Sequence, residues 1–262
     1  MPQSGCGTYL LGLLPSGATA KTYFAHYTVT SQSESILKAI AREDARRYVY
    51  NAVVSFLGGI GGLHTQQAAW AVTKLYYSAF YVGRAALCRA DRIIFHVPKP
   101  SGGGHTQYEL IVRAGETARI VSNPPSTHKL VARRFKEIGY PAFMASLEVD
   151  GHDPFLWMME QREYWQYRAA RFPDPDMPDM LAQVDIARVQ RLLEEYASDP
   201  TGLFLSDPDH ALLAIPFRLV TWALTHESLV SDGAANDDDL AYLRKRCQIG
   251  NQVLGGIRRL LV

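Results

Sequence analysis

The 262-residue sequence contains few cysteines, and these lie far apart. Cys6, Cys88 and Cys247 are odd in number and form no Cys-x-x-Cys pair. Their placement excludes a disulfide framework and the ligand spacing of a structural zinc site. We therefore expect a reduced protein of the cytoplasm that holds neither a metal nor another cofactor.

The sequence also lacks an excess of charge of either sign. Lysines and arginines number 27 against 26 aspartates and glutamates, which gives a net charge of +1 with neutral histidines. A general nucleic-acid binder carries a clear basic excess, so any contact with nucleic acid has to come from a local patch.

Long apolar segments are absent as well. There is no run of about 18 apolar residues, the length needed to span a membrane. No lysine or arginine precedes the short apolar segment Tyr9–Leu14, as it would in a signal peptide. Because hydrophobic residues still make up 47% of the chain, we expect a folded protein with a sizeable core and no membrane anchor.

Familiar catalytic and metal-binding motifs are incomplete. Residues 17–22 end like a phosphate-binding Walker A loop, but Ala20 stands where this loop requires a glycine. The acidic segment 174–179 lacks the glycine turn and the distal glutamate of a calcium loop. A second acidic segment, 207–210, has the residues that cap a helix N-terminus. A metal-dependent hydrolase is therefore the least favoured class of function.

Apolar residues at helical spacing dominate the chain after residue 35. The strongest pattern covers residues 66–90, which present one small, apolar face and a second, aromatic and basic face. The second face consists of Trp70, Lys74, Tyr77, Tyr81, Arg84 and Cys88. Further helices are expected at 36–56, 127–139, 154–171, 181–197, 210–228 and 238–261. Four glycines in Gly58–Gly62 are expected to end the first of them.

Two strand-like segments, 92–97 and 108–113, interrupt the helices, and a third short strand is expected at 117–121. The prediction is a mostly α protein with a small inserted β-hairpin. Residues 1–34 are expected to form a loop or short strand, residues 35–172 a helical bundle with the hairpin near 92–121, and residues 180–262 a C-terminal helical extension packed on the bundle. The proline- and aspartate-rich segment 172–179 separates the last two parts.

Arginines and aromatic residues alternate in the segment 162–168, Arg-Glu-Tyr-Trp-Gln-Tyr-Arg. The planar donor fork of arginine suits phosphate, and aromatic rings suit stacking on unpaired bases. The alternative is an ordinary helix surface in which Arg162 forms an ion pair with Glu160 or Glu163.

Three stretches, in this order, resemble the HEPN superfamily of helical domains. The segment Lys74–Leu87, with the sequence KLYYSAFYVGRAAL, resembles the tyrosine- and alanine-rich helix of that superfamily. Residues 127–129, Thr-His-Lys, followed by Phe135, resemble the Ser-His-Lys…Phe start of its next helix. Residues 162–168 resemble its later Arg-x-x-x-Asn-Tyr-Arg helix.

The resemblance implies a helical bundle that pairs with a second copy or with another protein, in a prokaryotic defence or toxin–antitoxin system. Many members are metal-independent ribonucleases. In these, an arginine and a histidine with four to six residues between them act on the phosphate attacked by the neighbouring 2′-hydroxyl, because the reaction needs a proton acceptor and a cation.

This chain has a degenerate form of that motif, since the position five residues after Arg162 is Tyr167. His128 is the histidine of the resemblance that could serve as proton acceptor instead. The resemblance therefore assigns a catalytic role to Arg162, Tyr167 and His128. It assigns RNA or phosphate binding to Arg84, Tyr77, Arg168 and Arg133.

The aromatic face of the helix 66–90 supports an alternative function. Trp70, Tyr77 and Tyr81 are of the residue types that anchor protein interfaces. In this alternative the protein is a non-enzymatic subunit of a helical assembly, and the helix 238–261 is also buried against a partner. The tyrosines are then packing residues and the arginines are ion-paired.

Overall fold

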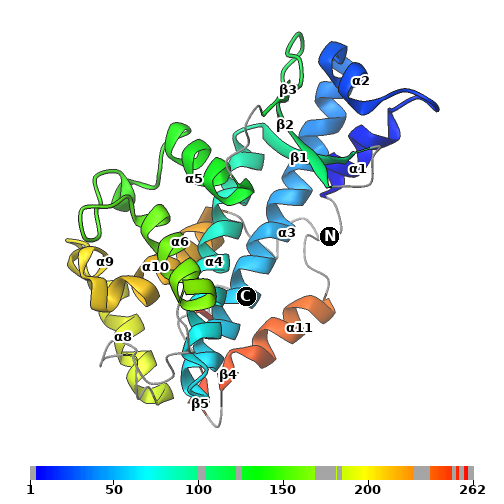
Figure 1. Cartoon of the computed structure of the whole chain (residues 1–262). Helices are drawn as coiled ribbons and strands as arrows, with labels where there is room; N and C mark the ends of the chain where they lie inside the picture. The colour runs from blue at the N-terminus through cyan, green and yellow to red at the C-terminus, as the bar shows by residue number, and fades with distance from the viewer. Residues whose placement is uncertain are drawn as a thin grey trace. The chain divides into compact units, whose positions relative to one another are not determined.

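The computed structural model describes residues 4–99, 104–121, 126–168, 181, 185–226, 237–249, 252–253 and 257–258. Over these residues the chain is mostly helical and contains a small three-stranded antiparallel sheet, as predicted (Figure 1). None of the described helices has the length and apolar character needed to cross a membrane. The predicted break at 172–179 lies outside the described residues.

The chain divides into two compact units. Unit 1 comprises Met1–Ala45 and Arg84–Ile138, and unit 2 comprises Arg46–Gly83 and Gly139–Val262. Two long helices, α3 (Ser31–His64) and α4 (Ala68–Arg89), contribute residues to both units.

Unit 1 combines a small sheet with three shorter helices. The helices are α1 (Gly5–Gly12), α2 (Ala20–His26) and α5 (Thr127–Glu137). The strands are β1 (Arg92–Pro98), β2 (His105–Ile111) and β3 (Arg119–Ile120), in the order β1-β2-β3. The predicted hairpin is therefore confirmed, with β1 and β2 paired antiparallel from Arg92↔Ile111 to Pro98↔His105.

The two faces of the β1–β2 hairpin differ in character, because side chains alternate between the faces of a strand. Phe95 and its cross-strand partner Tyr108 lie on the apolar face, and their rings stack at a centroid distance of 5.3 Å. Phe24 of α2 packs against both rings. The opposite face is polar, and it carries Arg92, His96, Gln107 and Glu109.

The structure corrects the expectation of a loop or short strand over residues 1–34, because α1 and α2 lie there. The buried carboxylate of Asp44 in α3 accepts hydrogen bonds from the backbone N–H groups of Gly5, at 2.7 Å, and Cys6, at 2.9 Å. These are two of the N–H groups that a helix leaves unsatisfied at its start. The acceptor lies 38 residues away from Cys6 in sequence, so no local pattern reveals this helix.

The structure also corrects the predicted end of the first long helix, because α3 continues through Gly58–Gly62 to His64. A Cβ atom at Gly59 would lie 2.7 Å from the Leu75 side chain of α4, and one at Gly62 would lie 3.1 Å from Ala71 Cβ. Each glycine costs about 1 kcal/mol relative to alanine in a helix. Close packing of α4 against α3 offsets that cost.

Unit 2 is built from helices and contains a second, very short hairpin. Its elements are η1 (Ala142–Met144), α6 (Pro154–Glu163), η2 (Tyr164–Arg168), α8 (Ile186–Ser198), α9 (Leu203–Ser206), α10 (Pro208–His226), α11 (Asp237–Arg246), β4 (Gln248–Ile249) and β5 (Gln252–Val253). Phe217 of α10 contacts Phe56 of α3 in the core, with ring centroids 6.1 Å apart.

The predicted C-terminal helix 238–261 is too long, because α11 ends at Arg246 and is followed by the paired strands β4 and β5. The residues between these strands in the sequence are Gly250-Asn251, a pair typical of two-residue hairpin loops. The regular apolar spacing that suggested a longer helix is compatible with short strands as well.

Candidate functional site

The segment predicted to carry the functional arginine begins as an ordinary helix. Asp153 caps α6 by accepting hydrogen bonds from the N–H groups of Phe155, at 3.1 Å, and Leu156, at 3.3 Å. Pro154 occupies the first turn, where a proline loses no helical hydrogen bond. After Glu163 the helix widens into the π-helical turn η2.

The π-helical turn explains how Arg162 meets Tyr167. Hydrogen bonds in such a turn link residues five apart, so that these residues lie on one face. Arg162 Nη2 donates to the Tyr167 hydroxyl over 3.5 Å. Single π-helical turns occur frequently at functional sites, and this one holds Tyr167, while Arg162 lies in the last turn of α6 just before it.

Arg162 lies between two tyrosine rings from different helices. Its Cζ atom is 5.3 Å from the ring centroid of Tyr167 and 5.7 Å from that of Tyr77 in α4. At these distances each ring attracts the cation through its quadrupole. The three residues form what we call the Arg162 patch: Tyr77, Arg162 and Tyr167.

Arg162 does not form the ion pairs that a plain helix surface would provide. Within the described part of the chain neither Glu160 nor Glu163 is its ion-pair partner, and its buried Nε–H donates to no acceptor. The guanidinium therefore keeps donors that the described residues do not use.

Tyr167 of the Arg162 patch and two other aromatic side chains of unit 2 are exposed. The exposed fractions are 71% for Tyr167, 56% for Trp70 and 51% for Tyr164. Trp70 and Tyr167 also line a pocket of about 190 Å³ together with Ala69 and Gln166. Aromatic groups of this size are costly to expose to water, so this part of unit 2 presents an apolar surface next to a cation.

The neighbouring Tyr76 belongs to the core and not to the patch. It is fully buried and packs edge-on against Phe155 of α6. Burial raises its pKa well above the ordinary value, even though the charge of Arg162 acts in the opposite direction. Its hydroxyl is therefore neutral and takes no part in acid–base chemistry near pH 7.

Three other predicted site residues, Arg84, His128 and Arg133, lie in unit 1. Arg84 donates from Nη2 to the carbonyl oxygen of Ile94 over 3.2 Å. His128 is in the first turn of α5, directly after Thr127. Arg133 lies on the outer side of α5, with 72% of its side chain exposed, and its Nε donates to Glu137 over 3.1 Å.

His96 of β1 also lies in unit 1 and was not among the predicted site residues. Its Nε2 lies 3.0 Å from the hydroxyl oxygen of Thr127, at the start of α5. Burial lowers its pKa, and the charges of Arg84 and His105 lower it further, so the ring is neutral at pH 7. Side chains of β1 alternate between the two faces of the sheet, and this alternation places His96 on the polar face, paired with Gln107. The same alternation in the sequence could have identified His96 as a polar-face residue.

The structure thus brings three of the seven predicted site residues together: Tyr77, Arg162 and Tyr167 of unit 2. Arg84, His128 and Arg133 belong to unit 1. Arg168 lies in η2 by its backbone, and its side chain is outside the described part.

The acidic segments provide no metal centre among the described residues. No group of three or more histidine, cysteine, aspartate or glutamate side chains there could hold a metal ion. Asp207 accepts a hydrogen bond from the N–H of Asp209 over 3.0 Å, as expected at a helix start. The segment 174–179 lies outside the described residues.

Comparisons with known protein families, curated proteins and solved structures identified no relative of this chain. Neither a protein-family model, a curated protein nor a solved structure matches this chain. Function therefore has to be argued from the geometry of the patch and from the three stretches of resemblance.

Proposed function

We propose that the protein binds single-stranded RNA through the Arg162 patch, as a HEPN-like component of a prokaryotic defence or toxin–antitoxin system. The observation that carries this proposal is the position of Arg162 between the rings of Tyr77 and Tyr167, without a carboxylate partner among the described residues. The biological context comes from the resemblance of residues 74–87, 127–135 and 162–168 to that superfamily.

The chemistry of the patch matches that of an unpaired nucleotide. Proteins recognise single-stranded RNA by stacking bases on aromatic rings and on guanidinium planes, and by pairing arginine with phosphate. Tyr167 and Trp70 are exposed enough to stack on bases. Apart from its buried Nε, Arg162 uses one Nη donor, for Tyr167, which leaves the other Nη–H groups for a phosphate oxygen. A local site of this kind agrees with a net charge of only +1.

Cleavage requires, in addition, a group that accepts the proton of the 2′-hydroxyl. The described contacts of Arg162 are with two tyrosines, and the predicted acceptor His128 belongs to unit 1. We therefore propose RNA binding by the patch, and treat metal-independent cleavage as a further activity that is measured separately.

The test compares two arginine variants. Arg162→Gln removes the charge of the patch, and Arg191→Gln removes an exposed charge from α8 as a matched control. We expect Arg162→Gln to weaken binding of a labelled single-stranded RNA about tenfold or more, by fluorescence anisotropy, because charge-assisted bonds to phosphate are lost. Arg191→Gln should bind like the wild type. Equal affinity of Arg162→Gln and the wild type would contradict the proposal.

The same RNA, incubated with each protein in the presence of a chelator and resolved on a denaturing gel, measures cleavage. Products that form with the wild type and not with Arg162→Gln would add a catalytic role for Arg162. Intact RNA in all samples would restrict the patch to binding.

One observation favours a second candidate function, that of an assembly subunit. Trp70 is 56% exposed on α4, and tryptophan is the residue type most enriched at interface hot spots. We propose as this alternative a homodimer that buries Trp70. Sedimentation velocity of the wild type and of Trp70→Ala tests it, because the dimer should be lost in the variant; a monomeric wild type contradicts it.

A further inference from the structure

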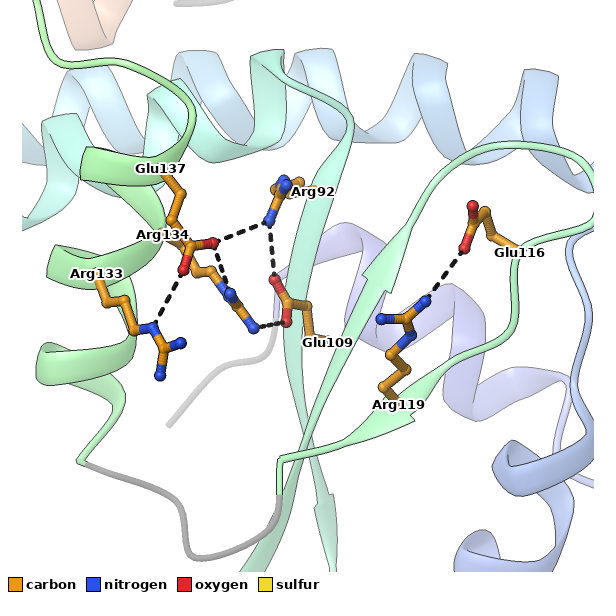
Figure 2. A network of polar contacts seen from close by, with 7 residues as sticks. All are labelled: Arg92, Glu109, Glu116, Arg119, Arg133, Arg134 and Glu137. Atoms are coloured by element: carbon orange, nitrogen blue, oxygen red, sulfur yellow. Dashed lines mark hydrogen bonds and ion pairs between the residues drawn. The ribbon is translucent and has the colours of Figure 1, made fainter.

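The polar face of the sheet in unit 1 holds a network of arginines and glutamates beneath α5. Figure 2 shows it: Glu109 of β2 faces Arg134 and Glu137 of α5, and Arg92 of β1 lies beside both carboxylates. Glu109 is a charged side chain with only 9% of its surface exposed. A buried carboxylate is stable only when it is paired, so its partners decide what this site can do.

One of the two inner arginines is tightly held. Arg134 donates from Nη2 to Glu109 Oε2 over 2.7 Å and from Nη1 to Glu137 Oε2 over 2.5 Å. Burial alone would raise the pKa of Glu137, but hydrogen bonds and charge from Arg134 and Arg133 lower it. These bonds are sufficient to fasten α5 to the sheet.

The other inner arginine is loosely held. Arg92 Nη1 lies 3.6 Å from Glu109 Oε1 and 3.6 Å from Glu137 Oε2. Both distances are too long for a hydrogen bond. Arg92 thus contributes charge to the network, and within the described part of the chain it has no hydrogen-bond acceptor for its guanidinium.

Two buried atoms of the network also lack hydrogen-bond partners among the described residues. They are the acceptor Glu109 Oε1 and the donor Arg134 Nε. A buried polar atom without a partner is energetically costly. The Glu109 oxygen can accept from a hydroxyl group, and the arginine N–H groups can donate to an anionic oxygen. A ligand that carries both groups therefore complements the network.

A pocket of about 180 Å³ opens at these atoms. Its charged lining residues are Arg92, Arg119, Arg134, Glu109, Glu116 and Glu137. Arg119 has 75% of its side chain exposed and lies 3.9 Å from Glu116, again beyond hydrogen-bond distance. Because pockets for larger organic ligands measure about 300–1,000 Å³, this one has room for a phosphate group and little beyond the adjoining sugar.

The charged side chains that line the pocket balance in number, three arginines against three glutamates. Two of these arginines are too far from their carboxylate neighbours for a hydrogen bond: Arg92 lies 3.6 Å from Glu109, and Arg119 lies 3.9 Å from Glu116. Their planar forks match the oxygens of phosphate.

We propose that this pocket binds a phosphate monoester that carries a hydroxyl group, such as a nucleoside monophosphate or a sugar phosphate. The phosphate lies between Arg92 and Arg119, and the hydroxyl donates to Glu109 Oε1. The site belongs to unit 1 and uses none of the residues of the Arg162 patch, so it is independent of the proposed binding of RNA.

Isothermal titration calorimetry with the full chain tests the proposal. The ligands are adenosine 5′-monophosphate, ribose 5-phosphate, inorganic phosphate and adenosine. Saturable binding of either ester, with no binding of adenosine, is the expected result. The ester that binds more tightly identifies whether the source is a nucleotide or a sugar. An inorganic phosphate that binds as tightly as the esters overturns the role of Glu109 as hydroxyl acceptor.

Variants locate the site. Arg119→Gln should weaken binding of the better ester about tenfold or more, and its thermal unfolding should match that of the wild type because the side chain is exposed. Arg42→Gln, an exposed arginine of α3 outside the pocket, is the matched control. Absence of saturable binding by both esters, or unchanged binding in Arg119→Gln, overturns the proposal. Arg162→Gln should leave ester binding unchanged whether or not RNA binding is lost.

Discussion

The two units hold a central arginine in opposite ways. In unit 1, Arg134 is fixed by two carboxylates, and Glu109 is buried with it beneath α5. In unit 2, Arg162 lies against the rings of Tyr77 and Tyr167 and has no carboxylate partner among the described residues. A guanidinium held by carboxylates fastens elements together, whereas one held by rings keeps its charge and donors for a ligand.

The two units also differ in a contact between secondary-structure elements, which is polar in unit 1 and apolar in unit 2. The sheet and α5 of unit 1 meet through ion pairs on a polar face, as Figure 2 shows. The part of α3 in unit 2 meets α4 through glycines that sit against Leu75 and Ala71. Polar contacts depend on pH and on the presence of both partners, whereas close apolar contacts depend on volume.

The largest effect is expected where the ion pairs of unit 1 are broken. Glu109→Gln leaves Arg134 facing a neutral amide in a largely buried site. Loss of one partner of a buried ion pair destabilises by about 3–5 kcal/mol, and partial exposure of Arg134, at 24%, reduces this to about 2–3 kcal/mol. Urea unfolding measures it. Glu116→Gln, whose contact with Arg119 spans 3.9 Å, is the control and should change stability by less than about 0.5 kcal/mol.

The next effect concerns the glycines of unit 2. Gly59→Ala would place a Cβ atom 2.7 Å from Leu75, and such overpacking costs about 1–3 kcal/mol. Gly61→Ala meets no atom within 4 Å and should stabilise the helix by about 0.5–1 kcal/mol. Urea unfolding of the two variants should therefore give changes of opposite sign. A stabilised Gly59→Ala would show that α3 and α4 do not pack closely there.

A smaller effect is expected from the rings that hold Arg162. Tyr77→Leu removes one ring from the cation, and Tyr77→Phe keeps it. An exposed cation–π contact contributes about 0.5–1 kcal/mol, so Tyr77→Leu should weaken RNA binding by roughly two- to fivefold, by fluorescence anisotropy. Tyr77→Phe should bind like the wild type. Equal affinity of the leucine and phenylalanine variants would show that the ring does not position Arg162.

The smallest effect is a pH dependence that comes from Glu137 of unit 1. The pKa of Glu137 is lower in the folded protein than in the unfolded chain, where it is about 4.3. The stability that this group contributes is therefore present above that value and is lost as the pH falls through the folded-state pKa. Urea unfolding between pH 7 and pH 3 should show a smaller loss for Glu137→Gln than for the wild type. The same loss in both would exclude Glu137 as a contributor.

Much of the fold could be predicted from the sequence. The apolar spacing of residues 66–90 predicted α4, which runs from Ala68 to Arg89, and the alternation of 92–97 predicted β1. The expected end of α3 at Gly58–Gly62 was wrong, because a glycine signals a helix end only where no neighbouring helix needs the space. Helix α1 could not be predicted, since its first N–H groups bond to Asp44 of another helix.

The candidate sites divide in a similar way. The alternation of arginine and aromatic residues in 162–168 pointed to Arg162 and Tyr167, and the π-helical turn then explained why they meet. Nothing in the linear sequence marked Arg92 and Glu109 as neighbours, because they come from two strands and meet beneath a helix that follows later in the chain.

The sequence by itself determined that this protein is mostly helical, that a small hairpin begins near residue 92, and that arginines and aromatic residues alternate in 162–168, since these properties depend on residue types at short spacing. The tertiary structure alone decided which charges are paired. Arg134 bonds to Glu109, which lies 25 residues away in the sequence. Arg162 of α6 contacts the ring of Tyr77, which belongs to α4. Whether an arginine is neutralised or available to a ligand depends on such distant partners, which only the folded chain brings within reach.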